Sequence, residues 1–240
     1  MYTDIATAAV SARLAPDASF IPRSVLPPIM PTLTVAAVAD VGPQTVAIEL
    51  DAPASFDAAP GQFVLVRRPG DDDAGYYTIS SPDVTETFEI TVGYPEDESP
   101  EESLGTWLAQ RDVDDEIEIE GPLGNIEYRG EGDVVVYAAG PGIGPAVGVA
   151  ERAIEADHDA TVVFRGEHPP HRARLDALDE AGATVVVVDT LDELDTDDPS
   201  VPTSAIYVFG FDDFVADVKA LLDAADRDPA EAAIESFGPA

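Results

Sequence analysis

The segment VVVYAAGPGIGPAVGVAERA, residues 134–153, decides how this chain folds. An uninterrupted apolar run leads into the glycine-rich turn at 140–145, and a helical stretch of small residues follows the turn. A strand, a tight turn and a helix N-terminus in this order can bind a phosphate group, because glycines let the backbone approach the anion while free N–H groups face it. Proline stands where the G-x-G-x-x-G pattern has its last glycine, so a tight connection without a ligand is the alternative.

The same rhythm continues to the C-terminus. The predicted strands are 133–140, 160–166, 183–190 and 205–210, and the predicted helices are 143–156, 172–180 and 214–225. Strands that are apolar on both faces and alternate with helices are typical of a parallel sheet covered on both sides. We therefore predict a doubly wound α/β nucleotide-binding domain over residues 132–240.

The part before residue 132 has a different pattern, in which short strands are separated by Gly, Pro and Asp. The predicted strands are 32–39, 45–50, 62–68, 76–80, 88–94, 116–120 and 125–129, with one helical stretch at 101–110. Regular short strands of this kind favour an antiparallel barrel or sandwich, and we predict a barrel domain over residues 30–131 in which six of these seven segments form the barrel. Residues 1–29 have weak periodicity and are predicted to be a loose extension, with a docking arm as the alternative.

The charge of the chain is extreme, with 48 acidic residues against 12 basic ones and a formal net charge of −36. Such a surface repels itself in dilute buffer, whereas at ~1 M salt exposed like charges barely interact. We expect a protein adapted to molar salt, from a halophile. The charge disfavours nucleic acids and anionic membranes as partners, because both bind through clustered Lys and Arg.

The absence of cysteine excludes disulfides, thiol catalysis and cysteine-ligated iron–sulfur clusters. No apolar run is long enough to span a bilayer, and the N-terminal residues lack the pattern of a secretory signal, so we expect a cytoplasmic protein without membrane insertion. His168 and His171 flank two prolines, and we interpret them as a surface loop rather than a metal site.

Four segments in order along the chain carry a resemblance. They are APGQFVLVRRPGDDDAGYYTISSPDVTETFEITVGY (59–94), GTWL (105–108), GPLGN (121–125) and AGPGIGP (139–145). In this order they resemble the ferredoxin reductase-like family of FAD- and NAD(P)-binding proteins. Within it, the chain is most similar to electron-transfer subunits related to the flavin subunit of dihydroorotate dehydrogenase. The resemblance covers residues 30–238.

The resemblance implies a flavin site in the barrel. The ring of Tyr77 is expected to pack on the isoalloxazine, and the hydroxyl of Thr78, the expected catalytic residue, to reach its reactive N5 edge. Ile79 and Ser80 would frame the ring, although an ordinary alternating strand is the alternative. The remaining expected contact is Gly105-Thr106, for the flavin pyrophosphate, where a simple helix cap is equally open.

The resemblance also implies a pyridine-nucleotide site in the second domain. The expected binding residues of the turn are Gly140, Gly142, Ile143, Gly144 and Pro145. Gly210 matches a glycine near the nicotinamide, and Phe237 belongs to a closing segment beside the flavin or, alternatively, to the core. NADH is favoured over NADPH because acidic residues follow the third strand, although Arg165, His168, Arg172 and Arg174 keep NADPH open.

Two positions depart from the family pattern. Gly75 stands where the family has an arginine that pairs with flavin phosphate, and Arg67 or Arg68 could replace it. Phe209 stands where the family has a cysteine. The resemblance implies an oxidoreductase that passes electrons from NAD(P)H through FAD to a protein or small-molecule acceptor. The alternatives are a non-catalytic or partner-dependent electron-transfer subunit and a nucleotide sensor without flavin.

Overall fold

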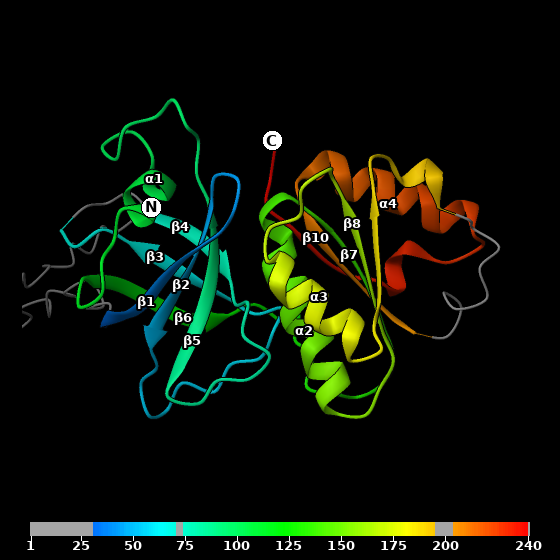
Figure 1. Ribbon diagram of the computed structural model, residues 1–240, viewed down its shortest axis with the longest axis horizontal. Coiled ribbons are helices and arrows are strands. Elements are labelled where there is room, and N and C mark those ends of the chain that lie inside the picture. Colours follow the sequence, from blue (N-terminus) through cyan, green and yellow to red (C-terminus); the bar gives the residue numbers. More distant parts are fainter. Residues whose placement is uncertain (1–30, 71–73, 195–203, 240) are drawn as a thin grey trace, which may run out of the picture.

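The computed structural model describes residues 31–70, 74–194 and 204–239, and these form two domains side by side (Figure 1). The predicted extension at 1–29 lies outside the described residues. An antiparallel sheet fills the first domain and a parallel sheet the second, as the sequence predicts.

The first domain is a six-stranded antiparallel barrel. Its strands are β1 (Thr32–Gly42), β2 (Thr45–Asp51), β3 (Phe63–Arg67), β4 (Ala74–Thr78), β5 (Thr87–Gly93) and β6 (Glu116–Leu123), in the order β4-β3-β6-β1-β2-β5. The outer strands meet where Ile79 pairs with Ile90 and the N–H of Ser80 donates to the carbonyl of Glu89 at 2.8 Å. This contact closes the sheet, so the predicted six-stranded barrel is confirmed.

Alternation along β5 shows how the barrel separates its two faces. Phe88, Ile90 and Val92 are fully buried in the barrel core, whereas Glu89 and Thr91 point outward. The short helix α1 (Leu104–Ala109) covers one end of the barrel, and the hydroxyl of Ser103 caps it by accepting from the N–H of Thr106.

The predicted strand at 125–129 is wrong. This segment is irregular and crosses from one domain to the other. Tyr128 is buried there, edge-on to Tyr207 of the second domain, and its hydroxyl donates to the carbonyl of Gly132 at 2.6 Å. The aromatic residue that suggested a strand therefore fastens the connection between the domains.

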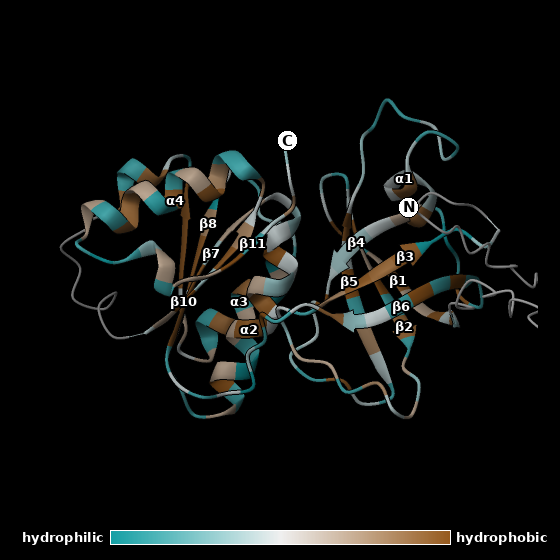
Figure 2. Cartoon of the chain, turned by 180° about the vertical axis from the view of Figure 1, so that it is seen from behind, coloured by the Kyte–Doolittle hydropathy of each residue, from teal (hydrophilic) through white to brown (hydrophobic). Residues whose placement is uncertain are grey.

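The second domain is a five-stranded parallel sheet. Its strands are β7 (Val134–Ala139), β8 (Ala160–Arg165), β9 (Thr184–Val188), β10 (Ala205–Gly210) and β11 (Ala233–Ser236), in the order β11-β10-β7-β8-β9. Helices α2 (Ile143–Glu155) and α3 (Arg172–Glu180) pack on one face, and α4 (Asp212–Ala224) packs on the other. The doubly wound prediction is confirmed, and Figure 2 shows apolar strands between amphipathic helices.

The order of these strands fixes where a ligand can bind. From β7 the chain proceeds outward to β8 and β9, then returns to β10 and β11 on the other side. In open parallel sheets, ligands bind beyond the carboxyl ends of the strands where the order reverses. Here that point lies between β7 and β10, next to the barrel (Figure 1). Among the described residues, no helix is long and apolar enough to cross a membrane.

Candidate functional site

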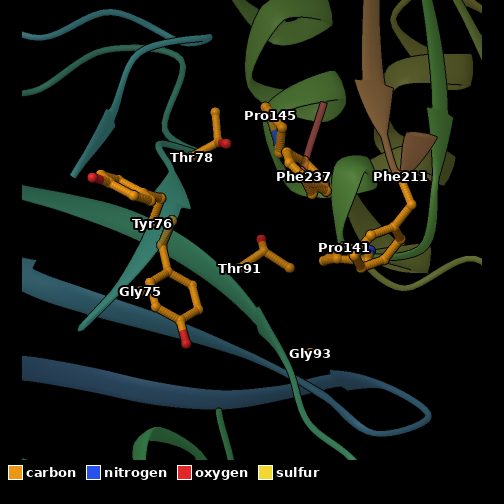
Figure 3. Close-up of a pocket in the computed structure, with 10 residues that line it drawn as sticks. Gly75, Tyr76, Thr78, Thr91, Gly93, Pro141, Pro145, Phe211 and Phe237 are labelled. Atoms are coloured by element: carbon orange, nitrogen blue, oxygen red, sulfur yellow. The ribbon is translucent and has the colours of Figure 1, made fainter. Parts of the chain in front are cut away.

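A cavity of about 220 Å³ lies between the barrel and the reversal point of the parallel sheet (Figure 3). It is lined by Gly75, Tyr76, Tyr77, Thr78, Thr91, Gly93, Pro141, Pro145, Phe211 and Phe237. Both domains therefore contribute to its wall. The lining is mainly aromatic and proline rings with two threonine hydroxyls, which suits a flat ring system with a polar edge.

Tyr76 and Tyr77 of β4 both line this cavity, and strand pairing decides how exposed each of them is. Tyr76 is paired with Leu65 on the outer face of the barrel, is 69% exposed and lies edge-on to Phe63, with ring centroids 5.4 Å apart. Tyr77 is paired with the buried Val64 and packs against the barrel core. Tyr76 is thus the more open of the two tyrosines.

Tyr77 also covers the position that lacks the expected arginine. A Cβ atom on Gly75 would lie 3.0 Å from Cε2 of Tyr77 and 3.1 Å from Cδ2 of Leu104 in α1. At these distances the side chains of Tyr77 and Leu104 would have to give by a few tenths of an ångström before a side chain could stand at this position.

The second domain contributes two phenylalanines. Phe211 and Phe237 meet edge to face with centroids 5.8 Å apart, and both face the cavity with Pro141 and Pro145 (Figure 3). The N–H of Phe237 donates to the carbonyl of Gly210 at 2.9 Å, so β10 holds the C-terminal segment in place. This contact fixes Phe237 beside the cavity.

A second cavity of about 420 Å³ adjoins the first one and shares Gly93, Pro141 and Phe211 with it. It opens beyond the carboxyl ends of β7 and β8 and is also lined by Gly140 and His168. Two ligands bound in the two cavities would meet at the shared residues.

A third cavity, of about 750 Å³, lies beside α4 at the carboxyl ends of β8 and β9. Its polar lining includes Arg165, whose guanidinium contacts Asp217 at 2.9 Å and Asp213 at 3.0 Å. Asp189 and Asp192 line it as well. The cavity is therefore acidic, because its arginine is already bound by two carboxylates.

Behind the first cavity, three buried polar side chains join the domains. Oγ1 of Thr91 lies 2.7 Å from Oγ of Ser80 and 2.8 Å from Nε2 of His171. The predicted surface loop is wrong for His171, which is only 3% exposed. Burial, together with the positive charge of Arg174, lowers the pKa of His171 to about 3, so its ring is neutral at pH 7.

Arg174 makes the charged contacts of the same interface. Its guanidinium contacts Glu151 of α2 at 2.6 and 2.8 Å, Glu89 of β5 at 2.7 Å and the carbonyl of Ser80 at 2.7 Å. Burial raises the pKa of Glu89 even though Arg174 lies beside it. Burial opposes the charge on Arg174 as well, but the two carboxylates outweigh it and raise its pKa.

The residues expected from the sequence are distributed unevenly around these features. The first cavity is lined by Tyr77, Thr78, Pro145 and Phe237, and the adjoining one by Gly140. Neither cavity is lined by Ile79, Ser80, Gly105, Thr106, Arg67, Gly142, Ile143, Gly144 or Gly210. Of these, Ile79 is in the barrel core and Ser80 belongs to the buried contact with Thr91.

The residues expected to bind the flavin phosphates differ in whether their polar groups are free to do so among the described residues. Helix α1 lies so close to β5 that a Cβ on Gly105 would be 2.6 Å from the carbonyl oxygen of Gly93. The hydroxyl of Thr106 points to the carbonyl of Pro95 at 3.4 Å. Arg67 has a buried Nε with no hydrogen-bond partner among the described residues.

Sequence reasoning missed Tyr76, Thr91, Pro141, Phe211 and Gly93 as lining residues. Phe211 directly follows Gly210, and Thr91 is an outward position of β5, so both have a signal once strand boundaries are known. Phe209, at the position of the family's cysteine, is fully buried against the helices and does not line the cavity. Among the described residues, no group of His, Asp or Glu side chains could hold a metal ion.

The sequence matches no protein-family model and no curated protein. Solved structures share the fold. The Amycolatopsis cytochrome P450 reductase GcoB is 20% identical over 88% of this chain and 71% of its own, with a TM-score of 0.70. The flavohem-like FAD/NAD-binding domain of nitric oxide dioxygenase from Vibrio cholerae O1 biovar El Tor is 20% identical over 87% of this chain and 98% of its own, with a TM-score of 0.70. Ferredoxin-NADP+ reductase from Plasmodium falciparum is 11% identical over 85% of this chain and 95% of its own, also at 0.70.

Proposed function

We propose that the chain is a flavin-dependent oxidoreductase module that passes electrons between NAD(P)H and a protein or small-molecule acceptor through bound FAD. One observation carries this proposal: an aromatic cavity with threonine hydroxyls lies where the barrel meets the reversal point of the parallel sheet. The solved structures with this fold include an FAD/NAD-binding domain and a ferredoxin-NADP+ reductase, which supports the same assignment.

The lining residues fit the isoalloxazine. Tyr76 and Phe237 would flank its plane from the two domains, and Tyr77 would contact its edge. The hydroxyl of Thr78 would hydrogen-bond at the reactive edge, which makes it the residue nearest the chemistry. Bound flavin would supply the two-electron chemistry itself, so the chain's residues bind and orient and none is required as a general acid or base.

The phosphate half of FAD has fewer evident contacts. Loss of the arginine at Gly75 would weaken binding by ~1.5–3 kcal/mol if nothing replaced its charge-assisted bond. Arg67 is at the end of β3, opposite Ala74, and its buried Nε, which has no hydrogen-bond partner among the described residues, supports a role in holding phosphate. Gly105 would approach the phosphates through its backbone at the start of α1, and Thr106 would contribute only if its hydroxyl exchanged the carbonyl of Pro95 for the ligand.

NADH is favoured as the reductant. The nicotinamide would enter from the second cavity along Gly140 and Pro141, toward the shared wall. The adenosine half would lie toward the acidic third cavity, where Asp213 and Asp217 already bind Arg165. A 2′-phosphate there would face carboxylates, and Arg165, the cation among the described lining residues, is already bound by two of them, whereas a 2′-hydroxyl would be tolerated.

The acceptor is proposed only by class. The chain has no cysteine, so electrons would leave the flavin for a partner protein or a diffusible acceptor rather than through an iron–sulfur cluster of its own. In this respect it would differ from the dihydroorotate dehydrogenase electron-transfer subunits that it otherwise resembles. The net charge of −36 supports a protein of a halophile that works in molar salt, and a cytoplasmic location is proposed with it.

The direct test is an absorbance spectrum of the protein purified in molar salt, before and after NADH. We expect a flavin spectrum that bleaches with NADH and recovers with an added acceptor. A colourless protein that cannot be reconstituted with FAD would remove the proposal. NADPH serves as the comparison, and we expect it to be the poorer reductant.

The alternative is a partner-dependent or non-catalytic electron-transfer subunit with weakened cofactor binding. Gly75 and Phe209, which replace two functional residues of the family, favour it specifically. Rapid reduction of the bound flavin by NADH without any partner would exclude this alternative. Retained flavin that only a partner can reduce would support it.

A further inference from the structure

The hydrogen bonds behind the first cavity connect three segments that are distant in sequence. Ser80 follows β4, Thr91 belongs to β5, and His171 precedes α3 in the second domain. Their side chains are 0%, 5% and 3% exposed, and Thr91 also lines the cavity. Thr91 therefore belongs both to the wall of the cavity and to the contact between the domains.

The backbone holds His171 in place from the barrel side. Its N–H donates to the carbonyl of Val41 at 2.7 Å, and its φ of 58° places it in the left-handed region. Asn, Asp and His are the non-glycine residues most often found in this region, so a histidine can adopt this conformation.

Helix α2 closes the other side of the threonine. A Cβ atom on Gly144 would lie 2.2 Å from Oγ1 of Thr91 and 2.6 Å from Oγ of Ser80. Only a glycine permits this approach, so the helix that begins at the glycine-rich turn touches the barrel at the same hydroxyl. The packing gives Thr91 little freedom to rotate.

Neutral His171 cannot act as a proton carrier near pH 7, but it can hold a hydroxyl in position. Arg174 is the charged group that faces it, and Glu89 and Glu151 bind that arginine. A neutral imidazole offers one nitrogen to Thr91 as donor or acceptor, whichever tautomer is present. Its role is therefore geometric.

We propose that His171 is a positioning residue that, through Thr91, fixes the barrel against the nucleotide-binding domain and so sets the spacing of the two adjoining cavities. The consequence for catalysis rests on the proposed function, in which those cavities hold the flavin and the nicotinamide. A shift of about 1 Å between reacting groups can cost on the order of a hundredfold in rate. Direct bonds across the interface are a means of preventing such a shift.

Four variants test this role. Thr91→Val keeps the shape of the side chain and removes its hydroxyl, and His171→Asn suits the left-handed backbone but is too short to reach Thr91. His171→Gln can place an amide near the position of Nε2 and should rescue. His158→Asn is the matched control, because His158 lies outside this interface, near Asp133.

The first readout needs no cofactor. A double-mutant cycle of Thr91→Val and His171→Asn, measured by chemical unfolding in molar salt, should give a coupling of about fivefold or more in the unfolding equilibrium constant. The second uses the FAD-loaded protein. We expect NADH to reduce the flavin on the order of tenfold more slowly in His171→Asn, with KM for NADH and flavin content within about twofold of wild type, and at least as slowly in Thr91→Val, whose side chain also lines the cavity.

The outcomes separate the two proposals. An additive cycle, or wild-type reduction rates in both variants, would overturn the role of His171, as would a loss of rate that merely follows loss of flavin. Restoration by His171→Gln, with no effect of His158→Asn, would support it. A wild-type protein that retains flavin but is not reduced by NADH would instead overturn the proposed function, while the cycle would still report on the interface.

Discussion

The two domains meet over two adjoining regions of opposite character. One is closed, where Thr91, His171 and Arg174 link buried polar groups and Gly144 leaves no space for a methyl group. The other is open, where aromatic rings surround a cavity of about 220 Å³. Among the described residues, the aromatic rings around the cavity do not form such a network of directional hydrogen bonds. The closed region is therefore the part of the interface that can hold the two domains at a fixed spacing. The comparison indicates that one region sets the geometry and the other binds.

Among substitutions in the closed region, replacing Arg174 should lower the free energy of unfolding most. Arg174→Met leaves the part-buried Glu89 and Glu151 without their shared cation, and breaking a fully buried ion pair in this way costs up to roughly 3–5 kcal/mol. We expect a loss of that order in the free energy of unfolding, measured by denaturant titration in molar salt.

Arg172→Met is the matched control for this prediction. Arg172 is in the same helix, but its side chain is 68% exposed and binds Asp176 one turn away. Such surface pairs contribute less than about 1 kcal/mol. Equal effects of the two substitutions would show that the closed region has no special role.

A methyl group added to the closed region should come next. In Gly144→Ala, the new Cβ would lie 2.2 Å from the hydroxyl oxygen of Thr91, so the helix or the barrel must move. Overpacking of this kind costs about 1–3 kcal/mol. Thermal unfolding should report the loss, and Gly132→Ala, which meets no atom within 4 Å, should show almost none.

Some elements of this fold could be predicted from the sequence and others could not. The parallel sheet and the barrel follow from apolar periodicity and turn residues, because burial on one or two faces leaves a pattern along the chain. The four-residue strand β11 was not predicted, because it is too short to show a period and exists by pairing with β10. The segment at 125–129 alternates like a strand, but within the described part of the chain it pairs with no other strand.

The site was predictable only in part, for a related reason. Resemblance pointed to the glycine-rich turn, to Tyr77 and Thr78, and to Phe237. The exposed position of Tyr76 depends on its pairing with Leu65, which no local pattern encodes. Likewise, His171 is buried because it contacts Thr91, which is 80 positions away in sequence. Its neighbouring prolines suggested a surface loop, because they carry no information about that distant contact.

The pH dependence of stability should also distinguish the two regions. The pKa of His171 falls from 6.5 to about 3 on folding, so the fold favours the neutral ring. The resulting stabilisation is complete above pH 6.5 and is lost as the pH falls toward 3. Between pH 8 and pH 5 this group should remove about 2 kcal/mol from the free energy of unfolding.

The measurement is the difference between the wild-type and His171→Gln stability curves, because carboxylates titrate in both proteins. We expect the wild-type curve to fall more steeply below pH 6.5. Parallel curves would mean that His171 is not buried as a neutral group. Variants of the open cavity should leave this difference unchanged.

The smallest expected effect concerns the open region. Tyr76 is 69% exposed, so Tyr76→Ala should leave the unfolding free energy of the flavin-free protein almost unchanged. An aromatic contact with the flavin ring contributes about 1 kcal/mol, so we expect FAD binding to weaken by roughly fivefold to tenfold. Fluorescence titration with FAD measures this, with Val113→Ala as an exposed control outside the cavity. If Tyr76→Ala destabilised the fold and left FAD affinity intact, the open region would be part of the structural interface, and the division between a closed region that positions and an open one that binds would fail.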